Sequence, residues 1–256
     1  MPHLILFLFL LPVLYRLFRA IREPDRLKAE EARQAKVYLG DYFGKARKSR
    51  VLDSVGEKLL DTTGLKARFF VLPSEVVNAV CLPNGDIFIW NGLLKEVKNK
   101  PDELAAILAH ELGHLKHEHY LRSIYWSALL QFVFGIFARP LGFWGRSVAS
   151  TIIKTGFSRF HEWEADAAAV DILKSCDFNP LALAAVLERV PQTKFPGLLK
   201  SHPDPKQRAT RIKKLCGVSE IEELPDVKDT QLEITRPIED DGLPDNVIMF
   251  PKSRRQ

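Results

Sequence analysis

The segment His110-Glu111-Leu112-Gly113-His114 constrains the fold of this 256-residue chain more than any other. It lies in a stretch, residues 102–120, with apolar side chains at helical spacing, and Pro101 favours a helix start just before it. On a helix, residues four apart share one face, so His110 and His114 can present two imidazole nitrogens to one metal ion. The fold must then bring a third ligand to this face from elsewhere in the chain.

Glu111 follows the first histidine and points toward the same side of the ion. There a carboxylate can take a proton from a metal-bound water, whose pKa the metal lowers to about 7. The alternative is a helix with scattered surface histidines. Apolar residues on the same helix favour a buried site instead, and these are Leu104, Ile107, Leu108, Leu112 and Leu115. The pattern therefore indicates hydrolytic metal chemistry.

A second helix is predicted over residues 158–175, and it carries carboxylates at helical spacing. Glu162 and Asp166 are four residues apart and share a face. One carboxylate can bind the ion, while the other accepts a hydrogen bond from the free N–H of a ligating histidine and fixes its tautomer. Glu164 points about 200 degrees away from Glu162 on the helical wheel and is expected to face solvent.

Three further histidines lie close to these segments. One straight helix would spread His110, His114 and His117 over roughly 10 Å of rise, which is too far for a tetrahedral ion with bonds near 2 Å. We therefore interpret His117 and His119 as surface or second-sphere residues. His161 is interpreted as a neutral neighbour of a ligand.

The remaining segments predict an α+β domain, mostly helical, with a small antiparallel sheet. Three runs of β-branched or aromatic residues, 69–72, 76–82 and 87–90, precede the metal-binding helix. Asn84-Gly85 between the last two runs predicts a hairpin. Other helices are predicted over residues 24–50, 51–60, 181–190 and 204–216.

The net charge of +5 is unevenly distributed along the chain. Residues 217–256 contain 10 acidic and 5 basic side chains, a balance of −5, so residues 1–216 carry +10. A basic body is attracted to nucleic acid or to anionic lipid, and charge alone does not choose between them. The three cysteines lie far apart with no C-x-x-C pair, which excludes a disulfide framework and a thiolate zinc site.

Residues 4–21 form an apolar segment that contains Arg16 and Arg19. As a helix it would be roughly 27 Å long, just short of the ~30 Å hydrocarbon core of a bilayer. We expect a single retained membrane anchor, against the alternatives of a cleaved signal peptide and a buried helix. Positive residues continue up to Lys28, so the positive-inside rule places the bulk of the chain on the cytoplasmic or matrix side.

Four ordered segments resemble motifs of the membrane-associated gluzincin zinc metalloendopeptidases, a family that includes HtpX, the CAAX prenyl protease and the mitochondrial Oma-type peptidase. They are residues 77–85 followed by 92–94, residues 110–114, residues 158–166, and residues 201–203 followed by Arg208. The matches run from about residue 69 to residue 211, over half of the chain. Together the four motifs are far more specific than any one of them.

Carried over position by position, the resemblance implies His110, His114 and Glu162 as zinc ligands. It implies Glu111 as the general base and later proton donor, and Asp166 as the carboxylate that supports a ligand. His202 matches a histidine near the site that can stabilise the oxyanion, with a plain loop histidine as the alternative. Asn78 falls on a strand that can pair with an extended substrate, with a polar residue at a strand end as the alternative.

These roles constrain a second apolar stretch, residues 124–138. If His114 and Glu162 reach the same ion, the chain between them crosses a bilayer an even number of times. Residues 121–157 number only 37, whereas two full spans need about 40 before any turn. We therefore expect an interfacial or re-entrant hairpin over this range, with an ordinary buried helix pair as the alternative.

The expected function is that of a zinc-dependent metalloendopeptidase with one Zn²⁺ per chain. The resemblance implies polypeptide substrates, such as membrane or misfolded proteins, and quality control at a bacterial or mitochondrial inner membrane. A zinc-binding pseudoprotease or scaffold and a basic DNA-linked repair protease are the alternatives, and nucleic acid is not the expected partner. The expected organisation is an anchor (1–23), a peptidase domain (24–216) and an acidic flexible tail (217–256).

Overall fold

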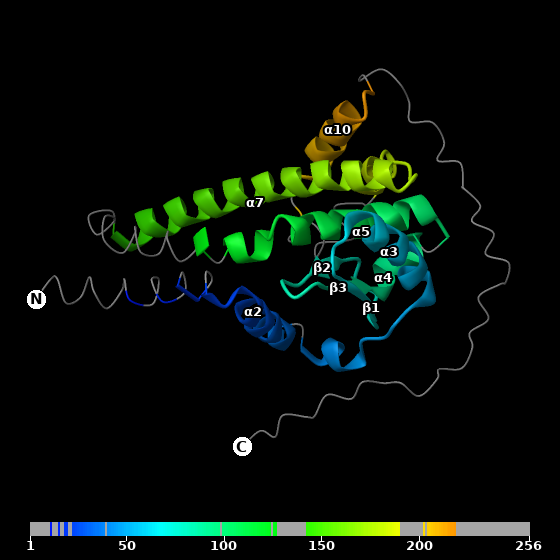
Figure 1. Ribbon diagram of the computed structural model, residues 1–256. Coiled ribbons are helices and arrows are strands. Elements are labelled where there is room, and N and C mark those ends of the chain that lie inside the picture. The colour runs from blue at the N-terminus through cyan, green and yellow to red at the C-terminus, as the bar shows by residue number, and fades with distance from the viewer. Residues whose placement is uncertain are drawn as a thin grey trace, which may run out of the picture.

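The computed structural model describes residues 11, 15, 18–19, 22–38, 40–97, 99–123, 125–126, 142–189, 202 and 204–218. Within these ranges the chain is mostly helical with one three-stranded sheet (Figure 1), which confirms the predicted α+β fold class. The helices are α2 (Pro24–Tyr38), the 3-10 helix η1 (Gly40–Lys45), α3 (Arg50–Thr63), α4 (Asn91–Val97), α5 (Pro101–Lys116), α7 (Gly142–Ser175), α8 (Ala182–Arg189) and α10 (Pro205–Leu215). The strands are β1 (Arg68–Leu72), β2 (Ala79–Cys81) and β3 (Asp86–Trp90).

The sheet has the strand order β1-β3-β2. β2 and β3 form the predicted antiparallel hairpin, and Gly85 adopts a φ of 83° in its turn, where its N–H donates to the carbonyl of Leu82 at 3.0 Å. β1 pairs in parallel with the other edge of β3, so the sheet is mixed rather than purely antiparallel. The chain reverses between β1 and β2 and again between β2 and β3, and two reversals leave the first and third strands running the same way. The strand β2 packs against α5, and no described strand pairs with its outer edge.

Helix α5 lies at the centre of the described fold. Every residue from Asp102 to Gly113 is buried, because α3, α4, α7, α8 and β2 all pack against this helix. Figure 1 shows α7 lying along α5 and extending well past its end. The two helices approach closely at Gly113, where an added Cβ would lie 2.7 Å from the carbonyl oxygen of Ala165. This contact is adjacent to the two histidines of the motif.

Two helices differ most in their bounds from the sequence prediction. Helix α2 ends at Tyr38 and gives way to a 3-10 helix, since Gly40 and Gly44 are poor helix formers. Helix α7 begins at Gly142, sixteen residues before the predicted start at 158. Part of the expected hairpin at 121–157 is therefore one continuous helix, and residues 127–141 lie outside the described residues.

The predicted anchor, residues 4–21, also lies almost entirely outside the described residues. Among the helices that the structure describes, none combines the length and the apolar character needed to cross a bilayer.

Candidate active site

Three side chains from α5 and α7 converge on one point. The Nε2 atoms of His110 and His114 are 3.1 Å apart, and the two carboxylate oxygens of Glu162 lie 3.3 Å from the first and 3.4 Å from the second. A tetrahedral ion with bonds of about 2.0–2.1 Å holds its ligand atoms about 3.3–3.4 Å apart. The two nitrogens and the carboxylate are therefore spaced closely enough to share one zinc-like ion, and this donor set of two imidazoles and a carboxylate suits zinc.

His202, just before α10, lies in the same cluster. Its Nδ1 is 3.0 Å from Glu162 Oε2 and 3.3 Å from His110 Nε2, so four side chains together can hold a metal ion. Its other nitrogen, Nε2, lies 3.7 Å from a carboxylate oxygen of Glu111. The general base predicted from the sequence is thus buried directly beside the cluster.

A buried ion pair lies behind the first histidine. The carboxylate of Asp166 is 3.0 Å from His110 Nδ1, and Arg208 binds the same carboxylate through Nε at 2.8 Å and Nη2 at 2.7 Å. The Nη1 atom of Arg208 also reaches Glu162 Oε2 at 2.8 Å. A protonated Nδ1 of His110 donates to Asp166, which leaves its Nε2 lone pair directed at the cluster.

Comparisons with known proteins agree with this geometry. Residues 46–216 match the model of peptidase family M48. The chain belongs to peptidase family M48. This membership confirms the predicted resemblance and the predicted class of enzyme, a metalloprotease.

The chain is similar to parts of several named proteases, one of which is mitochondrial. The chain is 31% identical over 170 residues to the mitochondrial metalloendopeptidase OMA1 of Arabidopsis thaliana, covering 64% of this chain and 34% of that protein. It is 23% identical over 182 residues to the β-barrel assembly-enhancing protease of Escherichia coli K12 (62% and 37% covered) and 27% identical over 164 residues to the HtpX homologue of Persephonella marina (54% and 55% covered). The chain thus spans about a third to a half of the length of these relatives.

The electrostatics of the site follow from burial and from the ion pairs. Burial lowers the pKa of His114 to about 3, so this imidazole is neutral and has a free lone pair. Burial and the charge of Arg208 act to lower the pKa of His110, but hydrogen bonds with Asp166 and Glu162 outweigh them and raise the value to about 9, so a metal ion that binds Nε2 must displace its proton. Burial would raise the pKa of Asp166, yet Arg208 holds it at about 2, so this group stays a carboxylate.

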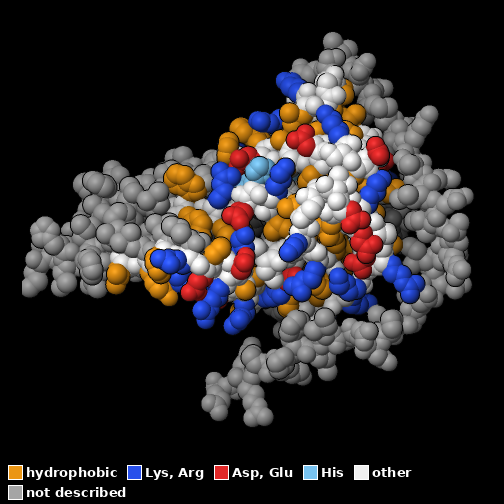
Figure 2. Space-filling view, in the orientation of Figure 1, with side chains coloured by type: hydrophobic (Ala, Val, Ile, Leu, Met, Phe, Trp, Pro, Cys, Tyr) orange, Lys and Arg blue, Asp and Glu red, His pale blue; other side chains and the backbone are white. Residues whose placement is uncertain are grey.

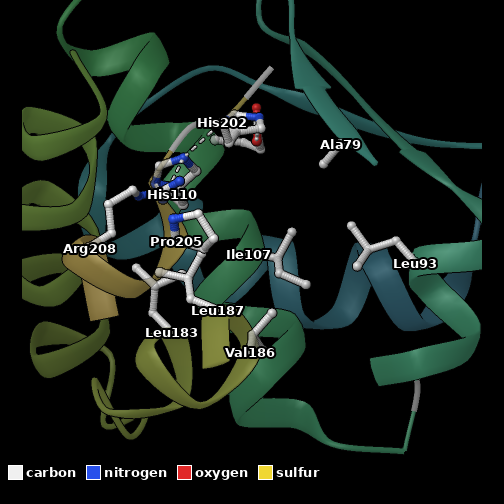
Figure 3. A pocket seen from close by; sticks show the side chains of 11 residues that line it. Ala79, Leu93, Ile107, His110, Leu183, Val186, Leu187, His202, Pro205 and Arg208 are labelled. Carbon is white, nitrogen blue, oxygen red and sulfur yellow. Dashed lines mark hydrogen bonds and ion pairs between the residues drawn. The ribbon is translucent and has the colours of Figure 1, made fainter. Parts of the chain in front are cut away.

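An apolar pocket opens beside Glu111 and the metal-binding cluster (Figure 3). Its walls come from four elements and consist of Ala79, Leu93, Ile107, Leu183, Val186 and Leu187. Polar residues of the site also line it, with His110, His202 and Arg208 drawn at one side of the view. The pocket can accept an apolar side chain of a ligand that also reaches the cluster.

Asn78 lies one residue before β2 rather than in it. Its backbone carbonyl accepts from the N–H of Trp90 at 3.0 Å, and its side-chain oxygen accepts from the N–H of Ala79 at 3.0 Å. This geometry matches the alternative of a polar residue at a strand end. A contact of Asn78 with substrate stays a prediction.

Sequence reasoning missed the role of Arg208. A signal was present, because Arg208 shares the buried face of α10 with Pro205, Ala209 and Ile212. A charged residue at a core-facing helical position requires a buried partner of opposite charge.

The structure distinguishes between the interpretations of two other residues. His119 is 3% exposed and its Nδ1 lies 2.8 Å from Nδ1 of His114, which fits the second-sphere interpretation and not the surface one. The side chain of Glu164 does not simply face solvent, contrary to expectation. Glu164 contacts His119 at 3.3 Å and Arg122 at 2.8 Å. The prediction assumed a helix running to residue 120, whereas α5 ends at Lys116 and the chain turns at Glu118 with a φ of 52°. No glycine marks this turn in the sequence.

Proposed function

We propose that this chain is a zinc-dependent endopeptidase that hydrolyses peptide bonds with an activated water. The observation that carries the proposal is the convergence of His110, His114 and Glu162, whose nitrogen and oxygen atoms approach one another at 3.1 to 3.4 Å, with a buried glutamate beside them. These three residues would hold one Zn²⁺. When bound, zinc supplies Lewis-acid polarisation of the substrate carbonyl and lowers the pKa of a water.

Residues of the chain would transfer the protons, stabilise the developing charge and position the ligands. Glu111 takes a proton from the attacking water and later gives it to the leaving amine. His202, whose Nε2 lies 3.7 Å from a carboxylate oxygen of Glu111, would donate a hydrogen bond to the negative charge that develops on the carbonyl oxygen. Asp166 and Arg208 hold His110 and Glu162 in position.

The proposed substrate is a polypeptide in extended conformation. It would lie along the outer edge of β2, where backbone hydrogen bonds recognise any sequence. One of its side chains next to the scissile bond would enter the apolar pocket, so we propose a preference for apolar residues there.

We further propose that the chain works at a membrane, on membrane or misfolded proteins. The apolar segment 4–21 supports an anchor, with a peptidase domain over 24–216 and an acidic tail over 217–256. Figure 2 shows Lys and Arg side chains gathered along the lower edge of the described face, which fits contact with anionic lipid. The names of the relatives, one mitochondrial and one enhancing β-barrel assembly, agree with membrane protein quality control as a role.

Zinc content and casein cleavage of the full chain in detergent test the proposal. Glu111→Gln should abolish cleavage while one zinc per chain remains bound, because only the proton acceptor is lost. Glu162→Ala should lose zinc and cleavage together. Glu57→Gln, a change at an exposed glutamate of α3, is the matched control and should retain both. A wild-type chain that binds zinc but cleaves nothing would identify a pseudoprotease instead.

A further inference from the structure

The chain turns just after α5. Glu118 adopts a φ of 52°, and residues 119–123 resume a helical conformation. As a result His119 is buried at 3% exposure instead of projecting beyond the end of α5. Its ring lies edge-on to the ring of His114, with centroids 4.9 Å apart.

A chain of polar contacts runs from His114 through this residue. The Nδ1 atoms of His114 and His119 are 2.8 Å apart. On the far side of the ring, His119 Nε2 is 3.3 Å from Glu164 Oε2. The Arg122 guanidinium donates to the same oxygen at 2.8 Å, and the ring of His161 stacks on His119 with centroids 4.3 Å apart.

The position of the proton on each of these ring nitrogens can be assigned in turn. His114 directs Nε2 at the cluster with Glu162, so metal binding needs a lone pair there and a proton on Nδ1. That Nδ1–H donates to Nδ1 of His119, which must then be the unprotonated nitrogen. The proton of His119 is therefore on Nε2, where it donates to the carboxylate of Glu164.

We infer that His119, anchored by Glu164, is a positioning residue that fixes the ring orientation and the tautomer of His114. The inference rests on the proposed role of His114 as a metal ligand. Each of the two histidine ligands then has its own support. His110 is held directly by the carboxylate of Asp166, and His114 is held by a carboxylate acting through a second imidazole.

The same residues offer a rival interpretation as a second metal site. Ligand atoms of His117, His119 and Glu164 lie within 4.8 Å of one another. One observation favours the positioning role. The carboxylate oxygen that faces His119 already accepts a hydrogen bond from the Arg122 guanidinium, whose positive charge repels a cation.

Zinc affinity, measured by competition with a chromogenic chelator and without substrate, tests the inference on the full chain in detergent. His119→Ala and Glu164→Ala should each weaken zinc binding by about 10- to 100-fold, the usual effect of removing a residue that supports a ligand. His117→Ala is the matched control, since His117 stacks on His119 but contacts neither His114 nor the carboxylate through a described hydrogen bond, and it should bind zinc like wild type. His119→Gln should recover much of the affinity, because an amide can also accept and donate.

The cobalt-substituted protein gives a second readout that general loosening of the fold would not produce. Its visible spectrum reports ligand geometry, and it should change in His119→Ala and recover in His119→Gln. Combining His119→Ala with Glu164→Ala should weaken zinc binding little more than either change alone, because both changes disrupt the same series of contacts from His114 to Glu164.

Two results would overturn the inference. One is a His119→Ala variant with wild-type zinc affinity and cobalt spectrum. The other is two zinc ions in the wild type, one of which is lost in both His117→Ala and Glu164→Ala, which would identify the second metal site. Because affinity is measured without substrate, a wild type that binds zinc but does not hydrolyse peptides would refute the proposed function and leave this comparison intact.

Discussion

At the scale of single residues, the site holds three buried carboxylates, those of Glu111, Glu162 and Asp166. Among the described residues, the guanidinium of Arg208 is the buried cation that pairs with two of them. Burial acts to lower the pKa of Arg208, but Asp166 and Glu162 raise it above its ordinary value, so the charge is permanent. A metal ion would add the remaining positive charge that the cluster needs.

Replacing Arg208 by methionine should therefore destabilise the fold strongly. The change leaves Asp166 without its buried partner, and breaking such a pair costs about 3–5 kcal/mol. Urea unfolding of the metal-free protein measures this loss. Arg211→Met, on the exposed side of the same helix, should change stability by less than about 1 kcal/mol. A loss of similar size in both variants would contradict the assigned role of Arg208.

The metal-binding residues could be predicted because helical geometry links sequence spacing to space. His110, His114 and Glu111 lie within one turn of one helix, so their convergence is a local property. The positions of His119 and Glu164 were not predictable in this way. They depend on the packing of α7 and on a turn at Glu118, which no glycine in the sequence marks.

At the scale of elements, the distance between α5 and α7 decides whether Glu162 reaches the histidines. Gly113 permits that distance, since a Cβ here would meet Ala165 backbone atoms at 2.7 and 3.0 Å. Backbone cannot move aside as the end of a flexible side chain can. The glycine of the motif is thus a packing requirement of the site.

Gly113→Ala should push the two helices apart and weaken zinc binding. Alanine is the better helix former by about 1 kcal/mol, but overpacking of a buried contact costs about 1–3 kcal/mol. We expect a net loss of stability in thermal unfolding, together with a lower zinc affinity. Gly44→Ala, whose added carbon meets no atom within 4 Å, serves as the control. Unchanged zinc affinity in Gly113→Ala would show that α7 is placed by other contacts.

Helix α2 is tied to the sheet by the buried carboxylate of Asp86. Lys36 donates to it at 2.9 Å, Asn84 at 2.9 Å and Arg68 Nε at 2.8 Å. Burial would raise the pKa of Asp86, but these partners lower it below its usual value. A depressed carboxyl pKa contributes stability above the unfolded value of about 3.9 and loses it as pH falls through the native value.

Asp86→Asn should therefore lower the free energy of unfolding by about 2 kcal/mol at neutral pH, since it weakens charge-assisted hydrogen bonds. The difference from wild type should shrink as the pH falls below about 4 and through the depressed pKa of the native carboxyl, where the wild-type group becomes protonated too. Chemical unfolding at several pH values measures both. A difference that is constant from pH 7 to pH 3 would contradict the ionic role of Asp86.

Helix types and the hairpin could be predicted from periodicity and from Asn84-Gly85, since both are local patterns. The parallel pairing of β1 and the early start of α7 at Gly142 could not. Strand pairing depends on which edge of β3 remains free after the hairpin forms. A helix start depends on local caps, and residues 141–144 carry no Ser, Thr, Asp or Asn whose side chain could cap the helix.

At the scale of the whole molecule, the site joins parts of the chain that are far apart in sequence. α5 supplies two histidines, α7 a glutamate, and the segment before α10 a third histidine. Such a site does not exist in the unfolded chain, so the free energy of metal binding adds to the free energy of folding. Stability and metal occupancy should therefore change together.

Removing zinc with a chelator should lower the midpoint of thermal unfolding of the zinc-bound wild type. At free zinc about 100 times the dissociation constant, binding contributes about 2.7 kcal/mol, and a domain of this size shifts by about 2–4 °C per kcal/mol. Calorimetry should thus show a decrease of roughly 5–10 °C. Glu162→Ala, which lacks one ligand, should melt at the same temperature with and without chelator. An equal decrease in wild type and variant would mean that the stabilising ion binds elsewhere, and the convergence of α5 and α7 would then need a different explanation.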